Sequence, residues 1–422
     1  MGNPVIQTYG QVLPHLHVEA VLSPLQPQTL RLHTWDGRTT ATRPTIEHKG
    51  FTYIPGPIDS GLVQAVRFPK RSAGFGSPTK LTSSMLDFLS RYANLSADTA
   101  NLLVASALAS WFTDCAQVSP VLYLLGPENE TGLILRLLGC LCRRPILLGD
   151  VDLTALGTLP GQLGATLLID QRNLSRSVRG ALRASNRRHF FIARGKCRLD
   201  VYGAKVFSAD PCSVDGAGLQ VCVSPAQDPL PELTDADEGE IGDDFQAKLL
   251  RFRMVSYSRV RDARLDCREF IPAMRGEIRT LLAPLWNCEE LRDAVSQYLL
   301  RQSQEAAGAR FTDLECVVSE AALFFCHTRA DTGEFFVGQL AEKVRALLKG
   351  RHEDFNLTDK KVRSALRGLG IRSARVTAGY KILLTDSVRE QIHRVAHAYQ
   401  TLPVQDGIAR CRHCPGWKPE TA

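Results

Sequence analysis

The stretch VLYLLGPENETGLILRLLGCLC, residues 121–142, decides how this chain is interpreted. An apolar, strand-like run leads to Gly126-Pro127, five residues follow, and a run with helical periodicity begins. Strand, glycine-containing turn and helix in this order are typical of a phosphate-binding loop, where backbone N–H groups and a helix N-terminus surround the phosphates. Gly126, Pro127, Thr131 and Gly132 are therefore candidate nucleotide-binding residues.

The side chains that such a loop normally supplies are missing. At the usual spacing, Thr131 stands at the second glycine position, Gly132 at the lysine position and Leu133 at the hydroxyl position. One inserted residue makes Gly132 the second glycine, but Leu133 and Ile134 then replace the lysine and the hydroxyl. Glu128 and Glu130 would also repel a triphosphate. The plain alternative is a buried strand and a core helix joined by a polar turn.

A second half of an NTPase signature follows at ATLLID, residues 165–170. An apolar strand ending in Asp170 is suited to hold Mg²⁺ for ATP, but the next residue is Gln171 where a glutamate usually polarises the attacking water. Glutamine keeps a hydrogen bond but cannot accept the proton. Each group of this kind contributes about 2–4 kcal/mol to lowering a barrier, so the combined loss argues against hydrolysis. Residual nucleotide binding stays open, as does an unrelated α/β fold.

The surrounding pattern predicts the fold class. Short, continuous apolar runs alternate with helical segments, which is typical of parallel strands covered on both faces. We expect an α/β P-loop NTPase-like domain with a parallel sheet, a small β-rich N-terminal segment, and an α-helical and winged-helix C-terminal domain. The expected strands are 120–125, 145–149, 165–169, 189–193, 204–208 and 219–223, with helices at about 131–142 and 174–185.

Six blocks of this region, in order and spacing, resemble the helicase-type (AAA+, superfamily 3-like) P-loop ATPase domain of phage and plasmid primase–helicase proteins. They are FLSRYANLSADTANLLVASALASWFTD, PVLYLLGP, LRLLGCLCRRPILLG, ATLLIDQ, SNRRHFFIARG and GAKVFSAD. The resemblance covers roughly residues 80–225, and a similar helical and winged-helix region continues to 400. It implies ATP-driven motion on DNA, often as a ring, with Gly126 and Gly132 in the loop and Asp170 as the metal-binding acid. The sequence departs from that pattern at Gly132, Leu133 and Gln171.

The chain has 422 residues, so more than one domain is expected. We predict a β-rich segment over 1–70, the degenerate ATPase-like domain over 81–225, and an acidic connector with helices over 226–330. A winged helix over 333–400 and a segment with a CxxC motif over 401–422 complete the organisation. There is no export signal and no long apolar run, and the twelve cysteines are scattered, so we expect reduced thiols in a cytoplasmic protein with no membrane partner.

Positive charge gathers in two regions. Residues 169–210 carry 10 Lys/Arg against 3 Asp/Glu, and residues 333–400 carry 13 against 7. The predicted helix near 174–187 places four arginines at steps of 3, 4 and 4, hence on one stripe: Arg176, Arg179, Arg183 and Arg187. Such a stripe suits an anionic partner, either the phosphates of DNA or the acidic surface of another subunit in a homo-oligomer. The alternative is a solvated face.

The C-terminal region reads as helix, turn, helix, hairpin and helix, the order of a winged helix. Thr358 is the expected N-cap of the second helix, with Leu357 before it. That helix would enter a major groove and the hairpin would touch the backbone, by phosphate contact rather than base reading. Winged helices also serve as protein-docking modules. The candidate DNA contacts are Lys360, Lys361, Arg363, Arg367, Arg372, Arg375 and Lys381.

Cys411-Arg-His-Cys414 has the spacing of half a zinc site. Zn²⁺ in a structural site has about four ligands, and His413 adds at most one, so an unliganded pair is the alternative. His393 and His397 share a helical face, which the sequence alone places at the surface or in the core.

Three functions remain open from these observations. The first is a DNA-binding, primase/helicase-like P-loop protein of a bacterial mobile element that does not hydrolyse ATP. The second is an active DNA-dependent ATPase or helicase, with catalytic groups from a neighbouring subunit or from Arg136 and Asp170. The third is a protein-interaction scaffold.

Overall fold

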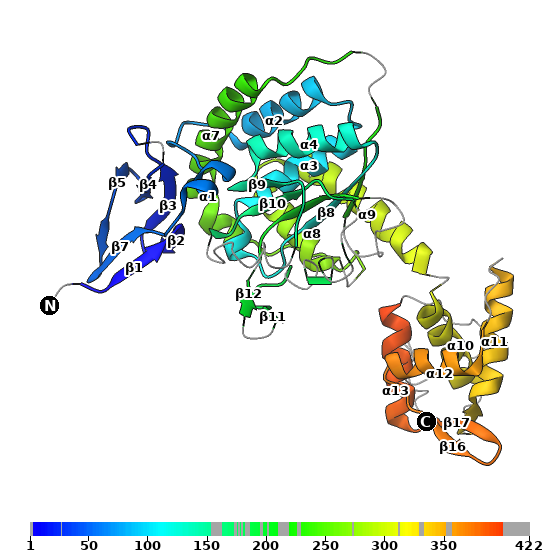
Figure 1. Ribbon diagram of the computed structural model, residues 1–422. Coiled ribbons are helices and arrows are strands. Elements are labelled where there is room, and N and C mark those ends of the chain that lie inside the picture. The colour runs from blue at the N-terminus through cyan, green and yellow to red at the C-terminus, as the bar shows by residue number, and fades with distance from the viewer. Residues whose placement is uncertain are drawn as a thin grey trace. The chain divides into compact units, whose positions relative to one another are not determined.

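The computed structural model describes residues 3–26, 28–152, 163–172, 175, 178, 180–181, 186–194, 197–200, 202–209, 219–225, 229–271, 274–310, 313–328, 333–351 and 357–399. The chain divides into two compact units, residues 1–300 and residues 301–422. Each is considered by itself (Figure 1).

The first unit begins with two small sheets, which confirms the β-rich N-terminal segment. One has the order β1-β7-β6, and the other, entirely antiparallel, has the order β2-β3-β4-β5. Strand β3 is buried on both faces over residues 18–21, and Val18 packs with Leu13 and Leu32 in a small core. The bounds are β1 Val5–Thr8, β2 Gly10–Leu13, β3 Leu16–Leu22, β4 Leu30–Trp35, β5 Thr40–Arg43, β6 Ile46–His48 and β7 Phe51–Pro55.

Three helices lead from these sheets into the α/β part: α1 Ser60–Ala65, α2 Pro78–Tyr92 and α3 Ala97–Ser110. The Ser77 hydroxyl accepts from the Lys80 N–H, and Pro78 stands at the first helical position of α2. The Ser96 hydroxyl caps α3 through the Thr99 N–H. Nearly all of α3 is buried, because Leu and Ala alternate around its whole circumference.

The centre of the first unit is a parallel sheet of five strands, which confirms the predicted α/β class. Its order is β14-β8-β13-β10-β9, so the first strand of the series lies between the fifth and the fourth. Helix α4 (Glu128–Leu141) lies against β9, β10 and β13, and α7 (Asp235–Asp262) packs along α4 (Figure 1). The strands are β8 Val121–Leu125, β9 Pro145–Leu148, β10 Thr166–Ile169, β13 Lys205–Ser208 and β14 Leu219–Cys222.

One expected strand belongs elsewhere. The run predicted at 189–193 forms β11 (Ile192–Arg194), which pairs antiparallel with β12 (Cys197–Leu199) instead of joining the parallel sheet. The prediction was wrong because an apolar run alone does not distinguish a sheet strand from a hairpin strand. Most of the helix expected over 174–185 lies outside the described residues.

Helices follow the sheet. Thr234 caps α7, and Asp235, Asp237 and Glu238 fill its first turn, where the helix dipole favours negative charge. Part of the predicted acidic connector is therefore the start of a 28-residue helix. Helices α8 (Arg275–Leu282) and α9 (Glu289–Arg310) complete the series. Among the described residues no helix is long and apolar enough to cross a membrane.

From residue 313 on, the described part of the second unit combines helices α10 to α13 with a three-stranded antiparallel sheet of order β15-β17-β16. Helix α10, assigned from sequence to the helical connector, packs on α11, α12 and α13 around Val318, Leu340, Leu366 and Ile392. Thr358 caps α12 through the Lys361 N–H, as predicted. The elements are α10 Leu314–Thr328, β15 Glu334–Phe336, α11 Val337–Gly350, α12 Asp359–Gly368, β16 Ala374–Val376, β17 Gly379–Leu383 and α13 Asp386–Ala398.

Candidate functional site

The candidate nucleotide site lies where β8 ends. Only Gly126 and Pro127 separate this strand from α4, which begins at Glu128, about one turn earlier than the sequence indicates. The Thr131 N–H donates to the Pro127 carbonyl at 3.0 Å, so residues 128–131 form a helical turn. The predicted loop over 126–132 is wrong in this respect: Glu128 and Glu130 in the first turn stabilise a helix N-terminus and place carboxylates where phosphates would bind.

Gly126 has a structural reason to be glycine. A Cβ at this position would lie 2.4 Å from the backbone oxygen of Val223, just beyond the end of β14. The pairing of β8 with β14 continues up to this point, since the Val223 N–H donates to the Leu125 carbonyl at 2.8 Å. The close approach of two backbone segments therefore explains this glycine without a phosphate.

We expect Gly126→Ala to destabilise the first unit by about 1–3 kcal/mol, because the added methyl group collides with backbone that must shift. Gly132→Ala is the matched comparison, since among the described residues its Cβ would meet only the Asp170 Oδ2 atom, at 3.3 Å. Urea unfolding of the two variants measures the difference. Equal stability of both variants would contradict the packing explanation.

Thr131 and Gly132 join the helix to the sheet. Thr131 is fully buried; its Oγ1 lies 2.9 Å from Ser208 Oγ at the end of β13 and also donates to the Glu128 carbonyl at 3.1 Å. Gly132 lies next to Asp170, since a Cβ at Gly132 would be 3.3 Å from Asp170 Oδ2. The structure thus brings Gly126, Gly132 and Asp170 to one edge of the sheet, but Thr131 is engaged in packing.

Arg136 cannot take the place of the missing lysine. Its Nε donates to Glu238 at 2.9 Å, and its Nη2 contacts the Asp235 carboxylate at 3.0 Å and the Leu233 carbonyl at 3.2 Å. All three partners belong to α7 or to the residues just before it. Arg136 therefore fastens α4 to α7 and points away from the β8 end.

In the second motif, the strand β10 followed by Asp170 and Gln171, the aspartate is exposed and the glutamine amide is hydrogen-bonded within the fold. Asp170 is exposed after β10. Gln171 accepts from the Val151 N–H at 3.0 Å and donates to Asp150 at 2.7 Å, so its amide holds the segment after β9 in place. An amide that both donates and accepts within the fold has a structural use that a glutamate could not fill in the same way.

Sequence analysis missed Arg172, whose Nη2 donates to the Gly126 carbonyl at 2.5 Å. The Arg172 guanidinium is thus a positive charge at the sheet edge where a nucleotide was expected, and it is hydrogen-bonded to backbone there. It comes from the residue after Gln171, a position to which the motif assigns no role, so the sequence carried no signal for it.

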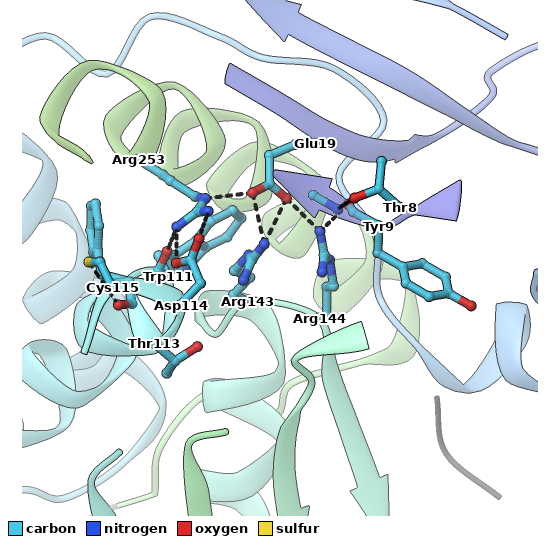
Figure 2. Close-up of polar contacts among 12 residues, drawn as sticks. Thr8, Tyr9, Glu19, Trp111, Thr113, Asp114, Cys115, Arg143, Arg144 and Arg253 are labelled. Carbon is cyan, nitrogen blue, oxygen red and sulfur yellow. Dashed lines mark hydrogen bonds and ion pairs between the residues drawn. The ribbon is translucent and has the colours of Figure 1, made fainter. Parts of the chain in front are cut away.

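A second feature that was missed is a buried ionic cluster, formed by Glu19 with Arg143, Arg144 and Arg253 (Figure 2). The N···O distances from Glu19 are 2.8, 2.5 and 2.6 Å respectively, and all four side chains are almost completely buried. Arg253 also binds the Asp114 carboxylate at 2.6 and 2.8 Å and donates to the Trp111 carbonyl. Strand β3, the end of α4 and helix α7 meet at this point.

The charges in this cluster depend on one another. Burial by itself would raise the pKa of Glu19, but the guanidinium groups of Arg143, Arg253 and Arg144 outweigh it and hold the pKa at about 2. Burial would likewise raise the pKa of Asp114, and Arg253 holds it well below its usual range. The cluster therefore stays ionised at neutral pH and fixes the N-terminal sheets to the α/β part.

The candidate DNA contacts of the second unit lie on α12, on the β16–β17 hairpin and between the two. Lys360, Lys361, Arg367, Arg372 and Arg375 are exposed. Arg363 lies over the Tyr380 ring at 4.0 Å, whereas the Lys381 ammonium pairs with Glu334 at 2.8 Å. A groove of about 660 Å³ runs between the start of α12 and the hairpin turn and is lined partly by Lys360, Arg363 and Tyr380.

The other predicted site residues are less completely placed. Arg176, Arg179, Arg183, Cys411 and Cys414 lie outside the described residues. Arg187 is exposed and its guanidinium lies over the ring of Phe190 at 6.0 Å. Within the described part of the chain, no group of three or more His, Cys, Asp or Glu residues is arranged to hold a metal ion.

No family model matches the chain, and no curated protein matches it. Three solved structures are similar at low identity. The apo C-terminal region of NrS-1 is 10% identical, with 87% of this chain and 96% of that chain covered and a TM-score of 0.33. A full-length MCM homolog from Methanopyrus kandleri is 11% identical, with 69% and 78% covered and a TM-score of 0.35. Drosophila ORC bound to DNA is 13% identical, with 78% and 95% covered and a TM-score of 0.20.

Proposed function

We propose that this chain is a DNA-binding protein related to primase–helicase ATPases, whose α/β domain has lost ATP hydrolysis. The observation that carries the proposal is the end of β8, where only Gly126 and Pro127 separate the strand from helix α4, which has Glu128 and Glu130 in its first turn. Phosphate binding needs backbone N–H groups free of nearby carboxylates, and transfer of a phosphoryl group needs cations at its oxygens. Arg136 and Gln171 both make hydrogen bonds within the fold, so neither replaces the missing lysine or the missing catalytic base.

ATP turnover tests the loss of hydrolysis. We expect the purified protein to hydrolyse ATP no faster than a protein-free blank, with or without DNA, because the lysine, the hydroxyl and the base are missing together. Asp170→Ala should leave this background unchanged. A DNA-stimulated rate that disappears in Asp170→Ala would show instead that the exposed aspartate still holds catalytic Mg²⁺, and would support the active-ATPase alternative.

The second part of the proposal is that the second unit is a winged helix, with α12 as the recognition helix and the β16–β17 hairpin as the wing. The order α10, β15, α11, α12, β16, β17, α13 supports this, as does the position of the exposed cations on α12 and the hairpin. A helix of about 10 Å diameter fits a major groove of about 12 Å width. The wing cations would then lie along the phosphates.

A salt series tests DNA binding. Fluorescence anisotropy with a labelled duplex should give an apparent Kd that rises steeply between about 50 and 200 mM salt, with a log–log slope of about 0.9 for each phosphate neutralised. Absence of binding at the lowest salt would remove the DNA-binding proposal and favour a protein-docking role for the same unit.

The resemblance to phage and plasmid proteins supports a role in a bacterial mobile element. Ring formation, which the same resemblance implies, would make Arg187 and the rest of the arginine stripe candidates for an interface between copies of the chain. Size-exclusion chromatography with light scattering distinguishes an assembled ring from a monomer.

A further inference from the structure

The groove between the start of α12 and the hairpin turn is large enough to hold a small ligand. Its volume is about 660 Å³, and its walls come from the start of α11, the start of α12 and the turn between β16 and β17. Sites for small ligands typically measure about 300–1,000 Å³. Helix α11 packs against both α12 and β17, so the walls belong to one folded unit and the groove is preformed.

One wall of the groove offers a surface for stacking. The Tyr380 ring is half-buried, and the Arg363 guanidinium lies over it at 4.0 Å. Among the residues that the structure describes, the buried Nε of Arg363 has no hydrogen-bond partner. Aromatic rings and guanidinium planes are the groups on which proteins stack nucleobases. A base that stacks on this pair can also supply the acceptor that the Arg363 N–H lacks.

The wall formed by α11 offers a hydrogen-bond donor and an acceptor side by side. Gln339 and Glu342 are three residues apart and therefore share one face of the helix. The Gln339 Oε1 accepts from the Phe336 N–H at 3.2 Å, so its NH₂ group is directed elsewhere as a donor. Glu342 is exposed, and within the described part of the chain its carboxylate forms no salt bridge.

The charges of the groove favour a nucleotide over a phosphate group alone. Lys360 and Arg363 contribute positive charge. Glu342 and Asp359 contribute an equal negative charge, which would repel an isolated phosphate. The Watson–Crick edge of a base presents both donors and acceptors, and it can therefore bond to a carboxylate and an amide together. The exposed Lys360 ammonium is then left to bind the phosphate of the same nucleotide.

A base can enter the groove only where it is not paired. In a duplex the Watson–Crick edge is occupied and both faces are stacked, so extraction of a paired base costs free energy that a bulged or mismatched base does not require. We propose that this groove binds one unpaired nucleotide of DNA, with the base stacked on the Arg363–Tyr380 pair. Its Watson–Crick edge contacts Gln339 and Glu342. The inference rests on the proposed DNA binding of the second unit and adds a preference for DNA with an unpaired base.

Binding of three duplexes to the full-length protein tests this preference. The duplexes have one sequence and are fully paired, or carry a single bulged adenine, or carry a bulged abasic site at the same place. The abasic bulge leaves the backbone flexibility in place and removes only the base. We expect the adenine bulge to bind about tenfold more tightly than the abasic bulge in fluorescence anisotropy, because a base stacked on an aromatic side chain adds affinity.

The ratio of these two dissociation constants identifies the residues that hold the base. Tyr380→Leu should bring the ratio close to one, and Tyr380→Phe should preserve it, because stacking requires the ring and not the hydroxyl group. Leu383→Ala is the control and should also preserve the ratio, since Leu383 is exposed on the same strand but does not line the groove. Circular dichroism checks that each variant is folded.

Glu342→Ala separates a base site from a phosphate site. Loss of one hydrogen bond to the base should lower the ratio about threefold. If the groove held only phosphate, removal of the carboxylate would strengthen binding of both bulged duplexes equally and leave the ratio unchanged, which would overturn the inference. Because Glu342 is exposed, this variant keeps the test decisive even if Tyr380→Leu fails to fold.

The outcomes for this inference and for DNA binding itself are distinct. A wild-type ratio near one, with tight binding of the paired duplex, would overturn the inference and leave the proposed DNA binding in place. Absence of binding to all three duplexes would remove both. A preference for the adenine bulge that persists in Tyr380→Leu would also overturn the inference, because the base would then bind outside this groove.

Discussion

Glu19→Gln is expected to destabilise the first unit by about 3–5 kcal/mol, the usual cost of removing one partner from a buried ionic cluster. The amide is nearly the same shape as the carboxylate, so packing changes little while the charge is lost. Arg143, Arg144 and Arg253 would then be buried, and within the described part of the chain only the partly exposed Asp114 pairs with this group. Urea unfolding, followed by the fluorescence of buried Trp111 and by circular dichroism, measures the loss.

Glu47→Gln is the matched control, because it makes the same chemical change at an exposed position of the same N-terminal segment. It should alter stability by less than about 0.5 kcal/mol. If Glu19→Gln proved as stable as Glu47→Gln, the arginines would have to be neutralised by another group, and the cluster would not hold the N-terminal sheets in place.

The pH dependence of the same variant tests the electrostatic origin of the effect. The Glu19 pKa in the folded protein, about 2, is below its ordinary value of 4.5. A carboxyl group with a lowered folded pKa contributes stability that is complete above pH 4.5 and is lost as the pH falls through 2. The difference in stability between the wild-type protein and Glu19→Gln should therefore narrow over that interval and stay constant between pH 5 and 7. A constant difference throughout would point to packing instead of charge.

The features predicted from the sequence are those set by neighbouring residues. The Thr358 cap and the buried strands β8, β10 and β13 follow from composition and short-range periodicity. Helix α4 starts earlier than a phosphate-loop pattern predicts, because Glu128 and Glu130 favour a helix N-terminus at this position.

What the sequence did not predict depends on contacts between distant segments. Residues 19, 143, 144 and 253 form one cluster, yet each alone resembles an ordinary charged residue of a strand or helix. The need for glycine at Gly126 arises from Val223, nearly a hundred residues later. Arg136 likewise pairs with Glu238 across the α4–α7 contact, so the direction of its side chain could not be predicted from its position in the helix alone.

The double variant Lys360→Ala/Lys361→Ala is expected to weaken DNA binding by about tenfold near 150 mM salt, and to lower the salt slope by about 2. Both lysines are exposed in the first turn of α12, the end of the proposed recognition helix that faces the groove beside the hairpin. If they contact phosphates, each releases about one counterion on binding, and the effect should be equal for unrelated DNA sequences. Anisotropy titrations at four salt concentrations give both quantities.

The control removes the same charge from the same unit but at other positions. Lys349 lies in the last turn of α11 and Arg394 on α13, both exposed. Lys349→Ala/Arg394→Ala should change the salt slope by less than half as much, because general attraction between a basic protein and DNA depends on net charge, whereas counterion release depends on contact. Equal slopes for the two double variants would mean that the net charge of the unit, and not the α12 surface, provides the affinity. The proposed docking of α12 in the major groove would then be wrong, even if the protein binds DNA.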